Sequence, residues 1–236
     1  MMLTAEEWQI MGLSLRVACW SVLASLPFAI ATAYVLARGN FPGKSLFDAL
    51  VHMPLVLPPV VIGYFLLLTF GRRGAVGEWL YDWFGITLAF RWTGAALACA
   101  VMGFPLLVRA IRLSFEAIDP KLEQAAQTLG AGLLGRFFAV TLPLALPGVI
   151  TGVLLSFARS LGEFGATITF VSNIPGETRT LPLAIYTLTQ VPGGDAQAMR
   201  LCVLAVVLSL AALLVSETLV RRASRQVLGY DAVGRH

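Results

Sequence analysis

Long apolar stretches separated by short polar segments dominate the sequence. An α-helix needs about 20 apolar residues to cross the hydrocarbon core of a bilayer, and five stretches approach or reach that length. We predict membrane-spanning helices at Leu13–Ala37, Pro54–Phe70, Gly94 to Val108 and on towards Leu113, Leu146–Phe170, and Leu201–Val220. The pattern therefore predicts an all-α membrane protein with about five transmembrane helices.

Two of these stretches contain residues that disturb an apolar helix. Pro58 and Pro59 must kink the second, because proline lacks a backbone N–H and clashes with the preceding turn. Arg159 and Glu163 interrupt the fourth. A further apolar run, Leu181–Thr189, is too short to span, and we predict a surface or re-entrant helix there.

Composition agrees with a lipid environment. Hydrophobic residues make up 58% of the 236 residues and charged residues 13%, about half the charged share of a soluble domain. The mean hydropathy is +0.80, so lipid is the expected solvent. The 17 Lys and Arg residues are scattered between apolar runs, without the basic patch of a nucleic-acid-binding protein. We expect no nucleic-acid partner.

The positive charges also predict an orientation, because Lys and Arg favour cytoplasmic loops. If the segment between the third and fourth spans is cytoplasmic, ten basic residues lie inside and six outside. The inside set is Arg38, Lys44, Arg109, Arg112, Lys121, Arg136, Arg221, Arg222, Arg225 and Arg235. The outside set is Arg16, Arg72, Arg73, Arg91, Arg179 and Arg200.

This orientation places the N-terminus outside and the C-terminus inside. Residues 1–11 are then an outer, periplasmic segment, and residues 222–236 a cytoplasmic basic tail. An independent observation agrees, since aromatic residues of membrane proteins gather at the interface. Four of them follow the second span, on the predicted outer side: Trp79, Tyr81, Trp83 and Trp92.

The sequence offers little for catalysis. Gly39–Ser45 resembles a phosphate-binding loop, but it has three residues between its glycines where the pattern G-x-x-x-x-G-K-[ST] needs four. The two histidines, His52 and His236, lie in no nucleophile or metal-site pattern. We expect no catalytic residue, no metal site and no ATP hydrolysis by this chain alone.

The segment of about residues 114–147, between the third and fourth spans, contains a second kind of helix. Asp119 and Pro120 form a typical helix start, and Gly130 should end the helix. One face is short and apolar, which suits docking into a groove on a partner protein. Its members are Leu122, Ala125, Ala126 and Leu129. Periodicity alone also fits an ordinary cytoplasmic helical hairpin.

The same segment resembles the EAA loop of ABC importer permeases, whose pattern is roughly E-A-A-x-x-x-G followed by F and L-P. The matching residues are Ala125, Ala126, Gly130, Phe137, Leu142 and Pro143. In that family the loop forms a coupling helix that sits in a cleft of the cytoplasmic ATPase subunit. Gln124 occupies the Glu position here, and Glu123 comes one residue earlier. Which of the two contacts the ATPase is left open.

Two further stretches narrow the resemblance. Arg159–Thr180 and Leu55–Tyr64 are similar to the molybdate permease subunits of bacterial ABC importers, and sulfate permeases share a looser version of the Gly-Glu-aromatic-Gly core. The resemblance implies that residues 12–221 form a type-1 permease domain with the MetI-like fold in the bacterial inner membrane. The implied function is ATP-driven import of molybdate, and the alternatives are tungstate or sulfate import, or a stand-alone channel or secondary transporter.

The resemblance also implies the partners. Five spans are too few to enclose a polar path, so a second copy of the chain is expected. A cytoplasmic ATPase subunit would bind ATP and Mg²⁺, and an external protein would deliver the oxyanion. Apart from membrane lipid, this chain is expected to bind no cofactor.

The fourth span holds the residues considered for the transport path. Glu163 follows Arg159 by one helical turn, so we expect the two to pair, with direct contact between Arg159 and the anion as the alternative. Ser156, Ser160 and Thr167 supply neutral hydroxyls that suit a conduit.

Small residues recur every four positions along this span, at Gly148, Gly152, Ser156 and Ser160. This spacing lets helices approach closely. Whether that face meets another span of the same chain or a second copy is left open.

Overall fold

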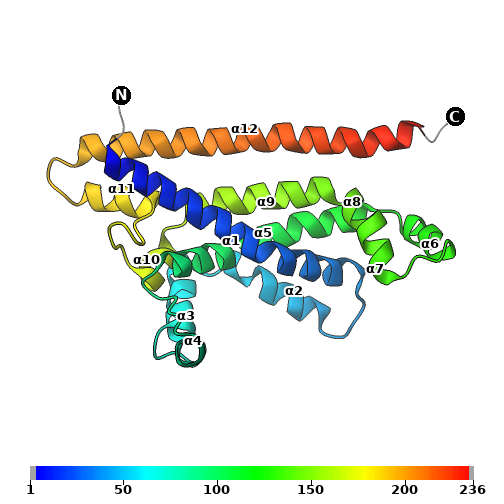
Figure 1. The fold of residues 1–236 in the computed structure, drawn as a ribbon, viewed down its shortest axis with the longest axis horizontal. Helices are drawn as coiled ribbons and strands as arrows, with labels where there is room; N and C mark the ends of the chain where they lie inside the picture. The colour runs from blue at the N-terminus through cyan, green and yellow to red at the C-terminus, as the bar shows by residue number, and fades with distance from the viewer. Residues whose placement is uncertain (1–3, 234–236) are drawn as a thin grey trace.

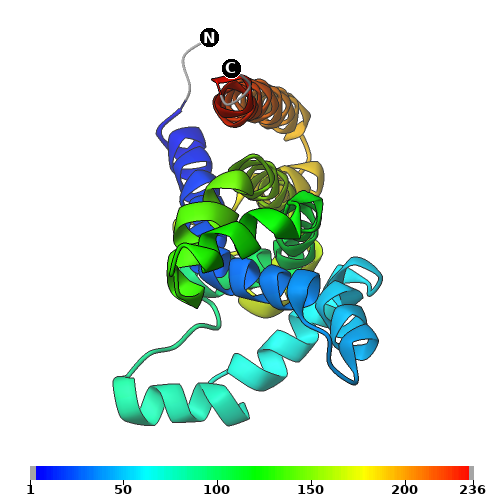
Figure 2. The ribbon, with the colours of Figure 1, turned by 90° about the vertical axis from the view of Figure 1, so that its right-hand side faces the viewer.

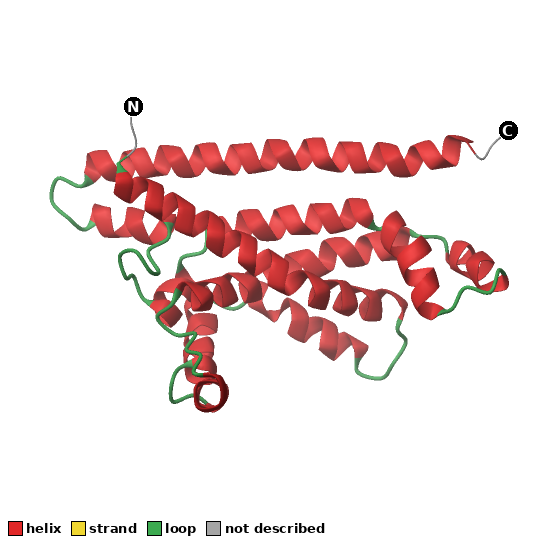
Figure 3. Ribbon diagram, in the orientation of Figure 1, coloured by secondary structure: helices red, strands yellow, loops and turns green. Residues whose placement is uncertain are grey.

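A computed structural model describes the backbone of residues 4–233 and the side chains of residues 4–215 and 218. Figure 3 shows helices joined by loops throughout this part of the chain. The longer helices are α1 (Ala5–Arg38), α3 (Pro59–Phe70), α4 (Ala75–Phe84), α5 (Trp92–Ala117), α9 (Leu146–Leu161) and α12 (Asp195–Val233). The shorter ones are α2 (Lys44–His52), α6 (Pro120–Thr128), α7 (Leu133–Arg136), α8 (Leu142–Leu144), α10 (Gly165–Val171) and α11 (Leu181–Thr189). A 3₁₀ turn, η1 (Met53–Leu55), and a π-helical turn, η2 (Phe137–Thr141), complete the set.

The helices form an elongated bundle. In Figure 1, α1, α5 and α9 lie along its centre and α12 runs along one side. The start of α12, α10 and α11 lie at one end, whereas α6 and α7 lie at the other. Figure 2 shows α3 and α4 projecting away from the central helices. The segment with the EAA resemblance and the short helix α11 are therefore at opposite ends of the molecule.

Several helices are long and apolar enough to cross a membrane. Among the described residues three qualify singly, namely Ala5–Arg38, Trp92–Ala117 and Asp195–Val215, and two bent pairs raise the number to five if each pair is one span. The predicted all-α membrane class is confirmed. The orientation, and the boundaries at residues 12 and 221, stay predictions.

The first helix begins earlier than the apolar pattern predicts. The Thr4 hydroxyl accepts the Glu7 N–H at 3.2 Å, and the Glu7 carboxylate accepts the Thr4 N–H at 2.8 Å. This capping box fixes the helix start at Ala5 instead of Leu13. Residues 5–11 of the predicted outer segment are thus continuous with the first long helix.

The second span breaks at its two prolines, as predicted. Pro58 is extended, and α3 starts at Pro59. The segment before the prolines, Lys44–Leu55, begins ten residues before the predicted span Pro54–Phe70, and it meets Pro59–Phe70 at 107°. With 12 residues, α3 is about 18 Å long, too short to cross the hydrocarbon core of about 30 Å alone.

The fourth span is not one run to Phe170, and this prediction is wrong. Helix α9 ends at Leu161 and α10 begins only at Gly165. The Glu163 side chain lies in the gap, and its Oε1 accepts the Ala166 N–H at 2.8 Å. The carboxylate satisfies a free backbone donor at the start of α10, so it stabilises a new helix where the sequence pattern predicts a continuous one.

The predicted short helix matches α11. Its Leu181, Leu183 and Ala184 are buried, and the Leu181 N–H donates to Ser14 Oγ of α1 at 2.8 Å. These contacts attach α11 to the bundle. Helix α12 continues to Val233, through the region that the sequence predicts as a basic tail. The tail's side chains and residues 234–236 lie outside the described part of the chain.

Candidate coupling and transport sites

Helix α6 forms as its sequence predicts. Asp119 Oδ1 accepts the Lys121 N–H at 2.9 Å, and Pro120 is the first helical residue. The helix ends at Thr128, and Gly130 follows with φ of +86°, a left-handed conformation that glycine adopts without a Cβ clash.

The predicted apolar face of α6 is largely uncovered. Leu122 is 48% exposed and Leu129 88%, Ala125 is exposed, and Ala126 is half-buried. Helix α7 adds two exposed side chains, and we call Leu122, Leu129, Leu133 and Leu134 the leucine surface. Exposed apolar side chains gathered in one segment are typical of protein contact sites.

Glu123 is held by its own chain. Its Oε1 accepts a hydrogen bond from Arg38 Nη2 and another from Thr141 Oγ1, both at 3.0 Å. The same Arg38 nitrogen donates to the Ile118 carbonyl at 3.2 Å. Glu123 thus connects α6 to the end of α1 and to η2, whereas the neighbouring Gln124 is exposed. Contact of either residue with an ATPase stays a prediction.

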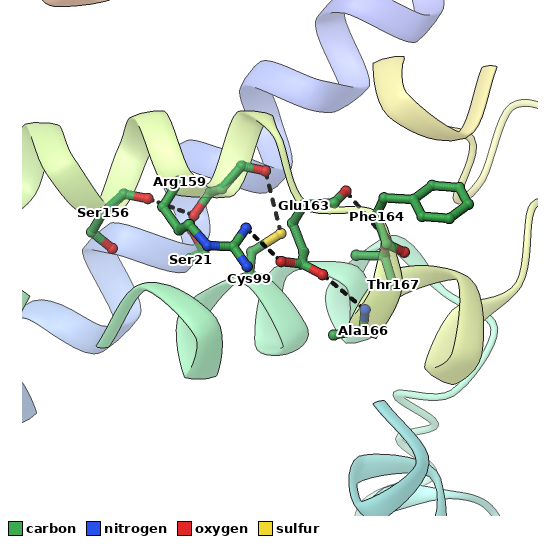
Figure 4. A network of polar contacts seen from close by, with 9 residues as sticks. Ser21, Cys99, Ser156, Arg159, Glu163, Phe164, Ala166 and Thr167 are labelled. Atoms are coloured by element: carbon green, nitrogen blue, oxygen red, sulfur yellow. Dashed lines mark hydrogen bonds and ion pairs between the residues drawn. The ribbon is translucent and has the colours of Figure 1, made fainter. Parts of the chain in front are cut away.

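Arg159 and Glu163 form the pair that their spacing predicts. Arg159 Nη1 lies 2.6 Å from Glu163 Oε2, and Figure 4 shows the two side chains converging below the end of α9. The Glu163 side chain is 1% exposed and that of Arg159 is 28% exposed. Because the carboxylate also caps α10, the pair has a structural role. A role in transport is a separate prediction.

The three hydroxyl groups of the predicted path lie inside the single chain. Ser160 Oγ donates to the Ser156 carbonyl at 2.8 Å and lies 3.0 Å from Ser21 Oγ of α1. Thr167 Oγ1 donates to the Phe164 carbonyl at 2.9 Å. Ser156 Oγ is buried without a hydrogen-bond partner in the described residues. The structure brings these residues together, and their contact with a transported anion stays a prediction.

The small residues of α9 pack within the chain. A Cβ atom added at Gly148 would lie 2.1 Å from Ser114 Oγ of α5, and one added at Gly152 would lie 3.0 Å from the Leu107 carbonyl oxygen. Ser156 in turn faces Gly103 of α5. The close approach therefore joins α9 to α5, and Ser160 extends it to α1.

Sequence reasoning missed the link between Arg38 and Glu123. The two residues are 85 positions apart, and no single motif contains both. The one available indication is that both are charged, with opposite sign, and both fall in segments predicted to be cytoplasmic. The ion pair of Glu7 with Arg200, at 3.3 Å between α1 and α12, likewise joins residues that are far apart in the sequence.

Within the described residues, no group of three or more His, Cys, Asp or Glu side chains is placed to bind a metal ion.

Comparison with known proteins assigns the family. The model of the family described as "binding-protein-dependent transport system inner membrane component" matches residues 25–227, which is most of the chain. The chain belongs to this family. Family membership and the apolar helices together identify the chain as a multi-pass protein of the bacterial inner membrane.

Relatives in this transport family are similar over nearly the whole chain. The molybdenum transport system permease protein ModB of Escherichia coli (strain K12) is 64% identical over 221 residues, 94% of this chain and 96% of that protein. The sulfate transport system permease protein CysT of the same organism is 39% identical over 204 residues, 86% of this chain and 73% of that protein.

A solved structure confirms the fold of this inner membrane component. The MetNI methionine ABC transporter, solved in inward-facing conformations, matches with a TM-score of 0.66 at 17% identity, over 92% of this chain and 94% of that one. The predicted MetI-like permease fold is confirmed.

Proposed function

We propose that the protein is the membrane-spanning permease subunit of an ATP-driven ABC importer that carries molybdate into the cytoplasm. The observation that supports this most is the 64% identity with a molybdenum permease along almost the full length of both chains. Helices α6 and α7 support the mechanism, because their leucine surface is exposed at one end of the bundle.

The cargo sets the physical requirement. A bare dianion in hydrocarbon faces a desolvation cost of order tens of kcal/mol, so the permease must open a wet path to each side in turn. One chain with up to five spans is too small to enclose such a path. We therefore propose that two copies form it between them.

The energy source would lie on a partner. In this proposal the leucine surface docks into a cytoplasmic ATPase subunit, which binds ATP and Mg²⁺, and this chain binds neither. Glu123 and Arg38 keep α6 attached to α1, so a displacement of α6 by the ATPase moves the membrane helix with it. On the outer side, a soluble protein would deliver the oxyanion, in keeping with the family's description as binding-protein-dependent.

Sulfate is the second candidate cargo, favoured by the 39% identity with a sulfate permease. Tungstate shares the tetrahedral shape and double charge of molybdate, so it is a third candidate cargo. A stand-alone channel or secondary transporter is disfavoured by membership of a family defined by its binding proteins. Uptake of molybdate by the reconstituted complex, measured with tungstate or sulfate as competitor, decides between the cargoes.

The coupling role is tested with charges placed on α6. Ala125→Glu together with Leu129→Glu puts two carboxylates on the docking face, and both positions are exposed in the isolated chain, so the variant should fold. Desolvating these charges in an apolar groove costs several kcal/mol, so we expect loss of ATP-dependent uptake and of ATPase retention during purification.

Thr128→Glu is the matched control, because it adds charge at an exposed position of α6 outside the apolar face. It should retain both properties. Normal uptake and normal ATPase retention in the Ala125→Glu, Leu129→Glu variant would contradict the coupling assignment.

A further inference from the structure

A groove runs between α5 and α9, away from the buried pair of Arg159 and Glu163. It has a volume of about 470 Å³ and is lined by α5 from Leu106 to Ala117 and by α9 from Pro147 to Leu155. Eleven residues of an α-helix rise about 16 Å, roughly half the hydrocarbon thickness of about 30 Å. The groove therefore extends from the end of α5 that leads to α6 towards the middle of the bundle.

Arg109 is the cation of this groove. It is exposed and lies eight residues before the end of α5 at Ala117, which corresponds to about 12 Å along the axis. Within the described parts of α1, α5, α9 and α12, every other arginine has a partner. These are Arg16 on Trp92, Arg38 with Glu123, Arg112 with Asp48 and Glu116, Arg159 with Glu163, and Arg200 with Glu7.

Arg109 has no ion-pair partner among the described residues. Its neighbours in the groove are mainly apolar, with the hydroxyl groups of Ser114 and Thr151 as exceptions. Thr151 donates its proton to the Pro147 carbonyl at 2.8 Å. Ser114, half-buried, makes no hydrogen bond to a described residue. A guanidinium and a free hydroxyl donor thus share one apolar groove, and both are donors that an oxyanion accepts from.

We propose that Arg109 contacts the transported tetrahedral oxyanion on the half of the path nearest α6. This inference rests on the proposed function. A single guanidinium attracts a dianion but does not enclose it, and a conduit must release its cargo. Arg159 differs from Arg109 in this respect, because Glu163 pairs with Arg159 and balances its charge.

The phosphate of an anionic lipid has the same chemistry as the cargo and is the other source of an oxyanion. A charged residue within a spanning helix is a functional candidate by default, whereas arginines near helix ends reach for the interface. The position of Arg109 within the groove, short of the helix end, favours the transported ion. The two sources respond differently to lipid composition.

The test uses the complete complex of permease, ATPase and binding protein in vesicles. Arg109→Gln should lower the rate of molybdate uptake roughly tenfold, the effect of losing a hydrogen bond to a charged group. Binding-protein-stimulated ATP hydrolysis should stay near the wild-type rate, and Arg109→Lys should restore much of the uptake. The control, Arg73→Gln, removes an exposed arginine from the loop before α4 and should transport normally.

Vesicle composition separates the two sources. If the cargo is the ligand, the Arg109→Gln defect is equal in vesicles of phosphatidylcholine alone and in vesicles containing phosphatidylglycerol. A defect seen only with phosphatidylglycerol would assign Arg109 to lipid and overturn the proposal, and so would normal uptake in both. If the wild-type complex takes up no molybdate, the proposed function fails instead.

A second measurement does not depend on transport. Ser114→Cys, with Cys19 and Cys202 changed to Ala, should react with a water-soluble anionic methanethiosulfonate faster than with its cationic analogue. Molybdate should slow this reaction, and Arg109→Gln should abolish the preference for the anionic reagent. An unreactive cysteine, or one that reacts equally with both reagents when Arg109 is present, would overturn the proposal.

Discussion

The ion pair of Arg159 and Glu163 gives the sharpest prediction about folding. Its two members differ in exposure, because the Glu163 side chain is 1% exposed and the Arg159 side chain 28% exposed. Arg159→Ala therefore leaves a carboxylate buried without its counter-charge. Breaking a buried pair in this way costs about 3–5 kcal/mol, and we expect a loss of that size in the free energy of unfolding.

Glu163→Gln should cost less, for two structural reasons. The amide oxygen still accepts the Ala166 N–H, so the cap of α10 survives. The remaining Arg159 is partly exposed and can turn its charged group towards water. We expect a loss of about 1.5–3 kcal/mol, the usual value of a hydrogen bond to a charged group.

The double variant Arg159→Met, Glu163→Gln removes both charges and keeps the cap. Because uncharged replacements of a buried pair are often neutral, it should recover most of the stability that Arg159→Ala loses, and part of the uptake.

Denaturant titration in detergent micelles, followed by tryptophan fluorescence, measures the stability, and vesicle uptake measures the transport. If Arg159→Ala is as stable as the wild type, or the double variant is no more stable than Arg159→Ala, the structural role is refuted. A double variant that folds fully but carries nothing would place Arg159 on the transport path.

Three further predictions concern packing, coupling and orientation. Gly103→Ala places a Cβ 2.3 Å from Ser156 Oγ and should destabilise the protein by about 1–3 kcal/mol. Adding Ser156→Ala should relieve this clash and restore stability, and a thermal scan in which the double variant does not recover contradicts the packing prediction. Glu123→Gln weakens the link to α1, so more ATP should be hydrolysed per molybdate imported, whereas an unchanged ratio would remove its coupling role. A single cysteine at Gly74 should react with an impermeant reagent from outside and one at Gln127 only from inside; the reverse would invert the predicted orientation.

The sequence by itself determined the class of the protein and those helix boundaries that are set by residues within one or two turns. Apolar runs of spanning length follow directly from residue order, and so does the break at Pro58 and Pro59. Helix α6 was equally predictable, because Asp119, Pro120 and Gly130 act within one or two turns of chain. The pair of Arg159 and Glu163 was predictable for the same reason, since its members are one helical turn apart.

Only the tertiary structure decided what these elements pack against. The small face of α9 could have met any helix, and its partner is α5, because Gly103 and Ser156 fit together there. The tie between Arg38 and Glu123 depends on two segments 85 residues apart meeting at one end of the bundle. Glu163 caps the start of α10 because burial leaves the Ala166 N–H no water to bond. Each of these outcomes depends on neighbours distant in the sequence, which a periodic pattern does not specify.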